Sequence, residues 1–120
     1  MILNKLAFTS ALILISSNAL AEYPSKYADL VESAKKHISS QLKDPYSAQF
    51  EGVFIGQGQV NKELPIVCGK VNAKNAFGGY VGAKRFYFVM ANNQIISDIE
   101  SDPTSFNILY EAMCTKRITQ

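Results

Sequence analysis

The sequence predicts an α+β fold with an N-terminal helix, a four-stranded antiparallel meander, a C-terminal helix and one disulfide. Three observations predict it. Apolar residues recur at helical spacing through residues 26–42, four β-like segments joined by turn residues fill residues 49–99, and an Asp-Pro pair at residue 102 opens a second helical pattern. Consecutive strands with short connections pair antiparallel, so we expect one sheet covered by the opening helix, in a two-layer domain.

The opening helix is predicted from one apolar stripe. Its members recur at spacings of three and four: Tyr27, Leu30, Val31, Ala34, Ile38 and Leu42. Ser25 is the expected N-cap, and Pro45 disfavours helical geometry at the residue before it, so the helix should end near Leu42 or Lys43. A membrane-surface helix is less favoured, because the polar face carries both signs of charge.

The strands are expected over residues 49–55, 65–72, 80–91 and 94–99, with Asn92 and Asn93 as a two-residue hairpin turn. Asp102 and Pro103 supply the N-cap and the first turn of the closing helix. The residues expected on one side of this helix are Phe106, Leu109, Tyr110, Met113 and Arg117.

The first 21 residues have the layout of a cleavable secretory signal. Lys5 precedes an apolar run over residues 6–15, and Ala19 and Ala21 provide the small residues of a cleavage site. The apolar run is short beside the ~20 residues of a spanning helix, and no cysteine follows Ala21 for lipid attachment, so no stable membrane anchor is expected. We therefore expect residues 1–21 to be removed and residues 22–120 to form a single domain in the periplasm, or secreted.

The chain has two cysteines, Cys68 and Cys114, and in an exported protein such a pair predicts a disulfide. A metal pair or a reactive thiol is less favoured, because the single histidine, His37, is distant in the sequence. The disulfide would join the closing helix to the second strand and stabilise the fold by roughly 4 kcal/mol.

Charge and motifs argue against several functions. The formal net charge is only +2 and the two signs are interleaved, so no nucleic-acid partner is indicated. The glycines at positions 78, 79 and 82 do not match the spacing or the strand-to-helix setting of a phosphate-binding loop. No cofactor and no metal are therefore expected.

The segment between the second and third strands is the candidate binding surface. Asn72, Asn75, Gly78, Gly79 and Gly82 concentrate residues that tolerate left-handed backbone. One interpretation is an irregular connection with a bulge at Gly82. The other is a ligand-binding loop, with Phe77 and Tyr80 as aromatic surface and with Lys74, Lys84 and Arg85 as the surrounding charges.

The third strand is apolar on both faces, because Phe86 and Phe88 alternate with Tyr87 and Val89. The opening helix covers one face. The closing helix covers the other, or that face stays partly wet, or it meets a partner. Tyr87 is therefore included among the candidate binding residues.

Catalysis is less favoured. His37 lies beside the apolar stripe, and a structural role suits it better than that of a general base. Asp98, Glu100 and Asp102 alternate at a strand end, where they could form a carboxylate pair or a calcium site, but a solvated strand end explains them equally. We therefore do not expect an enzyme, and a small hydrolase using these residues is the weakest alternative.

Two segments carry a resemblance to a known family. Residues 43–50 read Lys-Asp-Pro-Tyr-Ser-Ala-Gln-Phe, and residues 71–82 read Val-Asn-Ala-Lys-Asn-Ala-Phe-Gly-Gly-Tyr-Val-Gly. This combination resembles an uncharacterised family of small exported bacterial envelope proteins, often lipoproteins or prophage-borne. The resemblance spans roughly residues 26–90 and implies a Gram-negative periplasm, with no activity attached.

The function expected from the sequence is that of a non-catalytic module that binds an envelope or exported protein, as an inhibitor, an immunity protein or a phage-exclusion factor does. A structural envelope component that binds peptidoglycan or membrane is the alternative. The sequence specifies neither the partner nor the oligomeric state.

Overall fold

A computed structural model describes residues 23–59 and 62–119; the expected leader, residues 1–21, lies outside the described residues. Its elements in chain order are the 3-10 turn η1 (Ser25–Tyr27), α1 (Ala28–Ser40), the 3-10 turn η2 (Pro45–Ser47), β1 (Gln49–Gln57), β2 (Pro65–Asn72), β3 (Lys84–Ala91), β4 (Gln94–Ile99), α2 (Pro103–Cys114) and β5 (Lys116–Ile118). The α+β class is confirmed.

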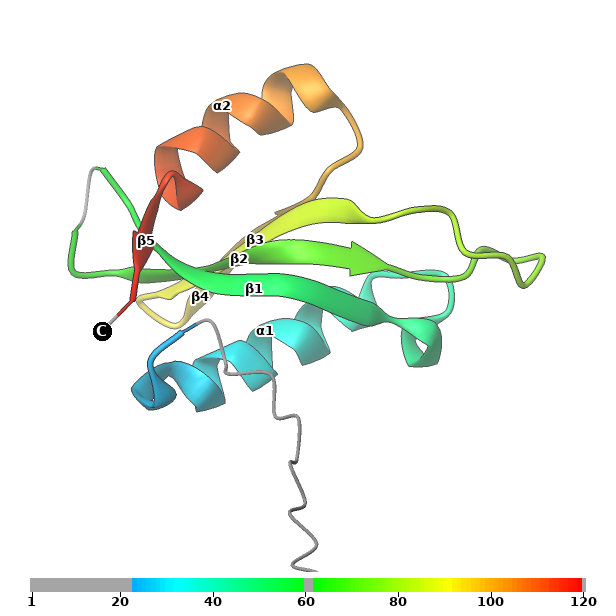
Figure 1. Ribbon diagram of the computed structural model, residues 1–120, viewed down its shortest axis with the longest axis horizontal. Helices are drawn as coiled ribbons and strands as arrows, with labels where there is room; N and C mark the ends of the chain where they lie inside the picture. The colour runs from blue at the N-terminus through cyan, green and yellow to red at the C-terminus, as the bar shows by residue number, and fades with distance from the viewer. Residues whose placement is uncertain (1–22, 60–61, 120) are drawn as a thin grey trace, which may run out of the picture.

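All strand pairs of the sheet are antiparallel, in the order β4-β3-β2-β1-β5. Helix α1 lies on one face of the sheet and α2 on the other (Figure 1). The domain therefore has three layers, and the expectation of two layers is wrong. Because the third strand is apolar on both faces, each face needs its own helix.

The fifth strand, β5, is the second difference from the prediction. The closing helix ends at Cys114, so Arg117 lies in β5, opposite Gly56 of β1, and not on the helix. Ile118 pairs with Ile55 and packs against the core beneath α1. The sequence prediction failed here because three residues are too few for a strand period.

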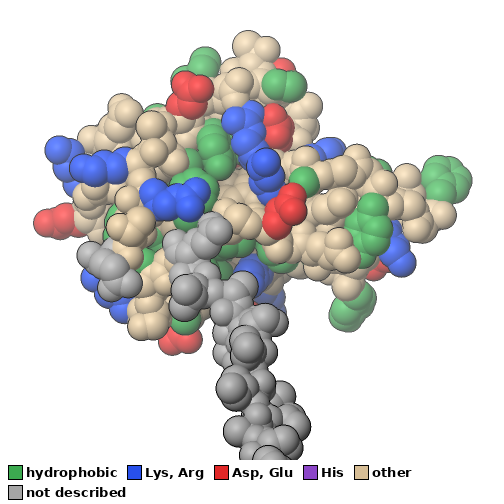
Figure 2. Space-filling model, viewed as in Figure 1, with side chains coloured by type: hydrophobic (Ala, Val, Ile, Leu, Met, Phe, Trp, Pro, Cys, Tyr) green, Lys and Arg blue, Asp and Glu red, His purple; other side chains and the backbone are tan. Residues whose placement is uncertain are grey.

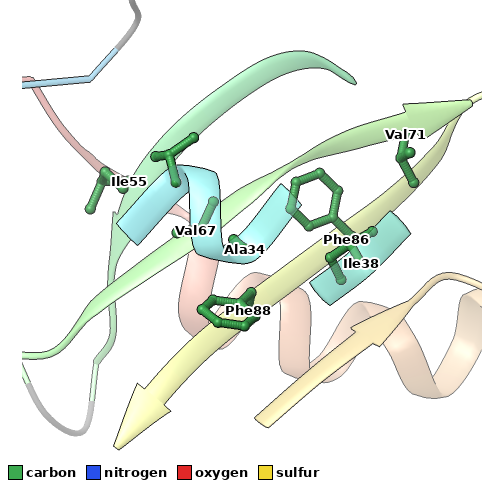
Figure 3. Packing of buried hydrophobic residues seen from close by; sticks show 8 residues of the cluster. Ala34, Ile38, Ile55, Val67, Val71, Phe86 and Phe88 are labelled. Atoms are coloured by element: carbon green, nitrogen blue, oxygen red, sulfur yellow. The ribbon is translucent and has the colours of Figure 1, made fainter. Parts of the chain in front are cut away.

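The core beneath α1 is aliphatic and aromatic (Figure 3). Its fully buried members are Val31, Ala34, Ile38, Ile55, Val67, Val71, Phe86 and Phe88. Helix α1 ends at Ser40, slightly before the expected end, and the chain closes with a tight turn in which the N–H of Gln41 bonds the carbonyl of Ile38. Ser25 lies in η1, and no side-chain cap bond forms at the start of that turn or of α1.

The core beneath α2 contains the disulfide, whose two half-cystines, Cys68 in β2 and Cys114 in α2, are buried. The predicted link between the closing helix and the second strand is confirmed. Tyr87 and Val89 of β3 pack in this core and are only 3% and 4% exposed, so α2 covers the second face of β3. Leu109, expected on the same side of the helix as Phe106, is half exposed, whereas Phe106 is buried.

Two local predictions for the turns are confirmed. Asn92 and Asn93 both have positive φ, as a two-residue hairpin turn requires. The Asp102 carboxylate accepts the N–H of Thr104 at 3.2 Å and caps α2.

Within residues 23–59 and 62–119, no helix has the length and hydropathy needed to cross a bilayer.

Candidate functional site

The connection between β2 and β3, residues 73–83, projects beyond both helices at one end of the domain (Figure 1). Strand β3 begins at Lys84 and not, as expected, at Tyr80; Tyr80 instead forms an isolated bridge with Lys74. The N–H of Val81 also donates to the carbonyl of Ala73, and the backbone has positive φ at Gly78 and Gly82. The segment is thus a narrow loop and not a continuation of the strand.

Asparagine side chains hold this loop in shape. The Asn75 side-chain oxygen accepts the N–H groups of Phe77 at 2.9 Å and of Gly79 at 3.1 Å. The backbone N–H of Asn75 donates to the carbonyl of Gly79 at 2.8 Å, and the Asn72 side-chain oxygen accepts the N–H of Gly82 at 3.0 Å. The loop therefore has a defined internal structure, with its backbone groups partnered locally.

Ser47 of η2 ties the loop to the chain that follows α1. Its hydroxyl oxygen accepts the N–H of Lys74 at 2.8 Å, and its O–H donates to the carbonyl of Asp44 at 2.8 Å. The Tyr80 hydroxyl donates to the carbonyl of Ser47 at 3.0 Å. Residues 44–47 and the loop of residues 73–83 are therefore one structural unit.

This unit displays apolar side chains to solvent. Phe77 at the loop tip is 97% exposed, Tyr46 of η2 is fully exposed, and Tyr80 and Val81 are about half exposed. Figure 2 shows hydrophobic side chains standing apart on this projecting end. Tyr46 was not among the predicted residues, because no sequence pattern indicates that η2 lies against the loop.

A groove of about 340 Å³ lies at the base of the loop, between the end of α1 and the start of β3. Three predicted residues, Lys74, Asn75 and Lys84, line it together with Lys43. Phe77, Gly78 and Gly79 do not line it. The predicted residues therefore divide between a groove and an exposed tip.

Arg85 lies apart from both surfaces. Its guanidinium donates to the Glu100 carboxylate at 2.7 and 3.2 Å and to the Asn107 side-chain oxygen of α2. It also lies over the rings of Phe106 and Tyr110. The hydrogen bonds to Glu100 raise the pKa of Arg85 and lower the pKa of Glu100. Arg85 thus fastens α2 to the sheet.

Tyr87 is also no part of an exposed surface. Its ring lies beneath α2, 5.5 Å from the ring of Phe106, and burial raises its pKa, with the nearby Asp98 as a smaller cause. Its inclusion among the binding residues rested on an uncovered second face of β3. The structure covers that face with α2, so Tyr87 is a core residue.

The residues weighed for catalysis are engaged by structural partners. His37 contacts the Ser97 hydroxyl at 3.2 Å and the Gln41 amide at 2.9 Å, Glu100 is paired with Arg85, and Asp102 caps α2. Among the described residues, no three histidine, cysteine or acidic side chains are placed to hold a metal ion.

A second hollow, of about 580 Å³, lies between α2 and the sheet and was not predicted. Phe54 and Tyr110 form part of its wall, with Glu51, Lys70 and Arg117 around them. The Arg117 guanidinium lies 4.1 Å from the centre of the Phe54 ring. Figure 2 shows basic and acidic side chains close together on this face. The hollow depends on the position of Arg117 in β5, which the sequence did not indicate.

A scan against protein-family models finds no match to this chain, and comparisons with curated proteins and with solved structures find none either.

Proposed function

We propose that this protein is an exported, non-catalytic binding module, and that it recognises another envelope or exported protein through the loop of residues 73–83 and η2. The observation that carries the proposal is the exposure of Phe77 and Tyr46 on a backbone fixed by hydrogen bonds. An aromatic side chain left in water gains most from burial in a partner's pocket, and a preformed loop loses little entropy on binding.

Two observations support export. The leader-like residues 1–21 predict secretion to the periplasm, and the buried disulfide between Cys68 and Cys114 is of the kind that persists in oxidising compartments. The resemblance of the loop and η2 sequences to envelope proteins is in line with the same location. The binding site lies on the part of the chain that carries that resemblance.

The test compares protein capture from an envelope extract by the purified protein and by two variants, Phe77→Ala and Tyr46→Ala. We expect each variant to lose the partner that the unchanged protein recovers. Both should fold normally, because these side chains are almost entirely exposed.

Ile108→Ala is the matched control. Ile108 is an apolar residue of α2, 71% exposed, on a different part of the surface. The Ile108→Ala variant should capture the same partner as the unchanged protein. Equal capture of the partner by all four proteins would rule out the proposed surface. Recovery of the protein with purified cell walls, in place of capture of a protein partner, would also rule it out.

A further inference from the structure

The groove at the base of the loop has an apolar floor. Side chains from four parts of the chain form that floor: Leu42 after α1, Val71 and Ala73 around the end of β2, Val81 of the loop and Ile99 at the end of β4. Its volume of about 340 Å³ is at the lower end of the range for ligand pockets. It has room for a few side chains of a bound segment.

The rim of the groove is basic. Lys43, Lys74 and Lys84 all line it, and Glu100 is the one acidic residue among the lining residues that the structure describes. The Glu100 carboxylate is already paired with Arg85 at 2.7 Å, so its charge is neutralised from the other face of the sheet. The groove therefore presents uncompensated positive charge, which favours an acidic occupant.

Asn75 adds directional donors to this charge. Its side-chain oxygen is occupied by the N–H groups of Phe77 and Gly79, while its side-chain NH₂ has no partner among the described residues. Because the oxygen is fixed by the loop, the NH₂ group is also fixed, and Asn75 lines the groove. An amide NH₂ beside lysines is a suitable set of donors for a carboxylate.

The polar groups of the lining favour a peptide over an acyl chain. Gln41 and Ser101 interrupt the apolar surface, together with Asn75. A lipid tail would offer these side chains no hydrogen bonds, whereas the N–H and C=O groups of a peptide could bond their remaining donors and acceptors.

We infer that the groove binds a peptide segment of the partner protein in which acidic side chains flank an apolar one. The acidic groups meet Lys43, Lys84 and the Asn75 amide, and the apolar side chain contacts the floor between them. This inference rests on the proposed function, since it names the chemistry of the segment that the same end of the molecule would recognise.

The test uses blocked peptides of the form Asp-X-Asp, where X is Ala, Val, Leu, Ile or Phe, and Asn-X-Asn peptides as the uncharged match. Binding is followed by backbone amide chemical shifts of the purified protein. We expect the acidic set to shift the resonances of Ala73, Lys84 and Ser101, and the uncharged set to leave them in place.

The double variant Lys43→Glu/Lys84→Glu should bind the acidic peptides about tenfold more weakly or worse. Both lysines are exposed, so its unfolding temperature should stay within about 2 °C of the unchanged protein. Lys116→Glu, at an exposed lysine of β5, is the matched control and should bind as before. Shifts confined to other surfaces, equal binding by the double variant, or no binding by any acidic peptide would overturn the inference.

The two proposals fail separately. Phe77→Ala removes the aromatic side chain at the loop tip, which does not line the groove. This variant should therefore lose the captured partner and still bind the acidic peptides. If the peptides do not bind while Phe77→Ala still loses the partner, the groove inference falls and the proposed function stands. Binding of anionic lipid vesicles in place of the peptides would also overturn the inference.

Discussion

The Ser47 hydroxyl accepts the backbone N–H of Lys74 at 2.8 Å, although the two residues are 27 positions apart. This bond joins η2, which follows α1, to the loop between β2 and β3. Because Tyr80 bonds the carbonyl of the same serine, the loop is held at two points on one residue. These two hydrogen bonds therefore hold the loop with the exposed tip against η2.

Ser47→Ala should weaken the attachment of the loop to η2. The variant leaves the partly buried N–H of Lys74 without its acceptor, so we expect a loss of about 1–2 kcal/mol in the free energy of unfolding. Hydrogen exchange at Lys74 should quicken more than exchange in β2. Ser40→Ala is the control, because the Ser40 hydroxyl donates to a carbonyl at an exposed helix end and its loss should cost under about 0.5 kcal/mol. Unchanged exchange at Lys74 would contradict this prediction.

The disulfide is expected to supply a large part of the stability. Cys68 and Cys114 close a span of 46 residues, so Cys68→Ala/Cys114→Ala should lose roughly 4 kcal/mol in the free energy of unfolding. Urea unfolding with and without a reductant measures the same contribution on the unchanged protein. Titration of two free thiols in the native protein, or equal midpoints under both conditions, would contradict it.

Much of the fold was predictable from local patterns. The stripe of α1, the alternation in β3 and the turn at Asn92 are signals within a few residues of one another, and each predicted its element. The disulfide was predictable because only two cysteines were present to pair. The ends of the elements were less predictable, since Tyr80 is of a residue type common in strands but β3 begins only at Lys84.

The candidate site was predictable only in part. The sequence placed Lys74, Asn75 and Phe77 in one loop, but the neighbouring Tyr46 comes close only through contacts made by Ser47. Alternation along β3 puts Arg85 and Tyr87 on one face, but it does not show that α2 covers that face. Long-range packing decides both points, and a single sequence holds no local signal of it.

Gly56 of β1 should be intolerant of any side chain. A β-carbon at this position would overlap the carbonyl oxygen of Met113 and press on the Cα of Cys114, both backbone atoms of α2. We therefore expect Gly56→Ala to displace the end of α2 and to cost about 2 kcal/mol or more in the free energy of unfolding. Gly79→Ala is the control, since its nearest neighbour there is an Asn75 oxygen at 4.0 Å. Equal stabilities for the two variants would show that α2 does not pack closely on β1.

Glu100 should give the protein an acid-sensitive link between the sheet and α2. Hydrogen bonds from Arg85 lower the pKa of Glu100 below its ordinary 4.5, so the folded state binds this proton less readily than the unfolded state. The stabilisation is therefore complete above about pH 5 and is lost as the pH falls below 4.5 through the folded-state pKa.

Glu100→Gln should lower the free energy of unfolding by about 1 kcal/mol at pH 7, a modest figure because the pair is partly solvated, and by almost nothing near pH 2. The raised pKa of Arg85 does not change this dependence, because its stabilising effect is present over the whole of this range and is lost only at strongly alkaline pH. Urea unfolding at several pH values measures the difference, with Glu32→Gln as the control, because that carboxylate is 73% exposed and its contact with Lys35 is weak. A constant difference between Glu100→Gln and the unchanged protein from pH 7 to pH 2 would mean that the ion pair does not set this dependence.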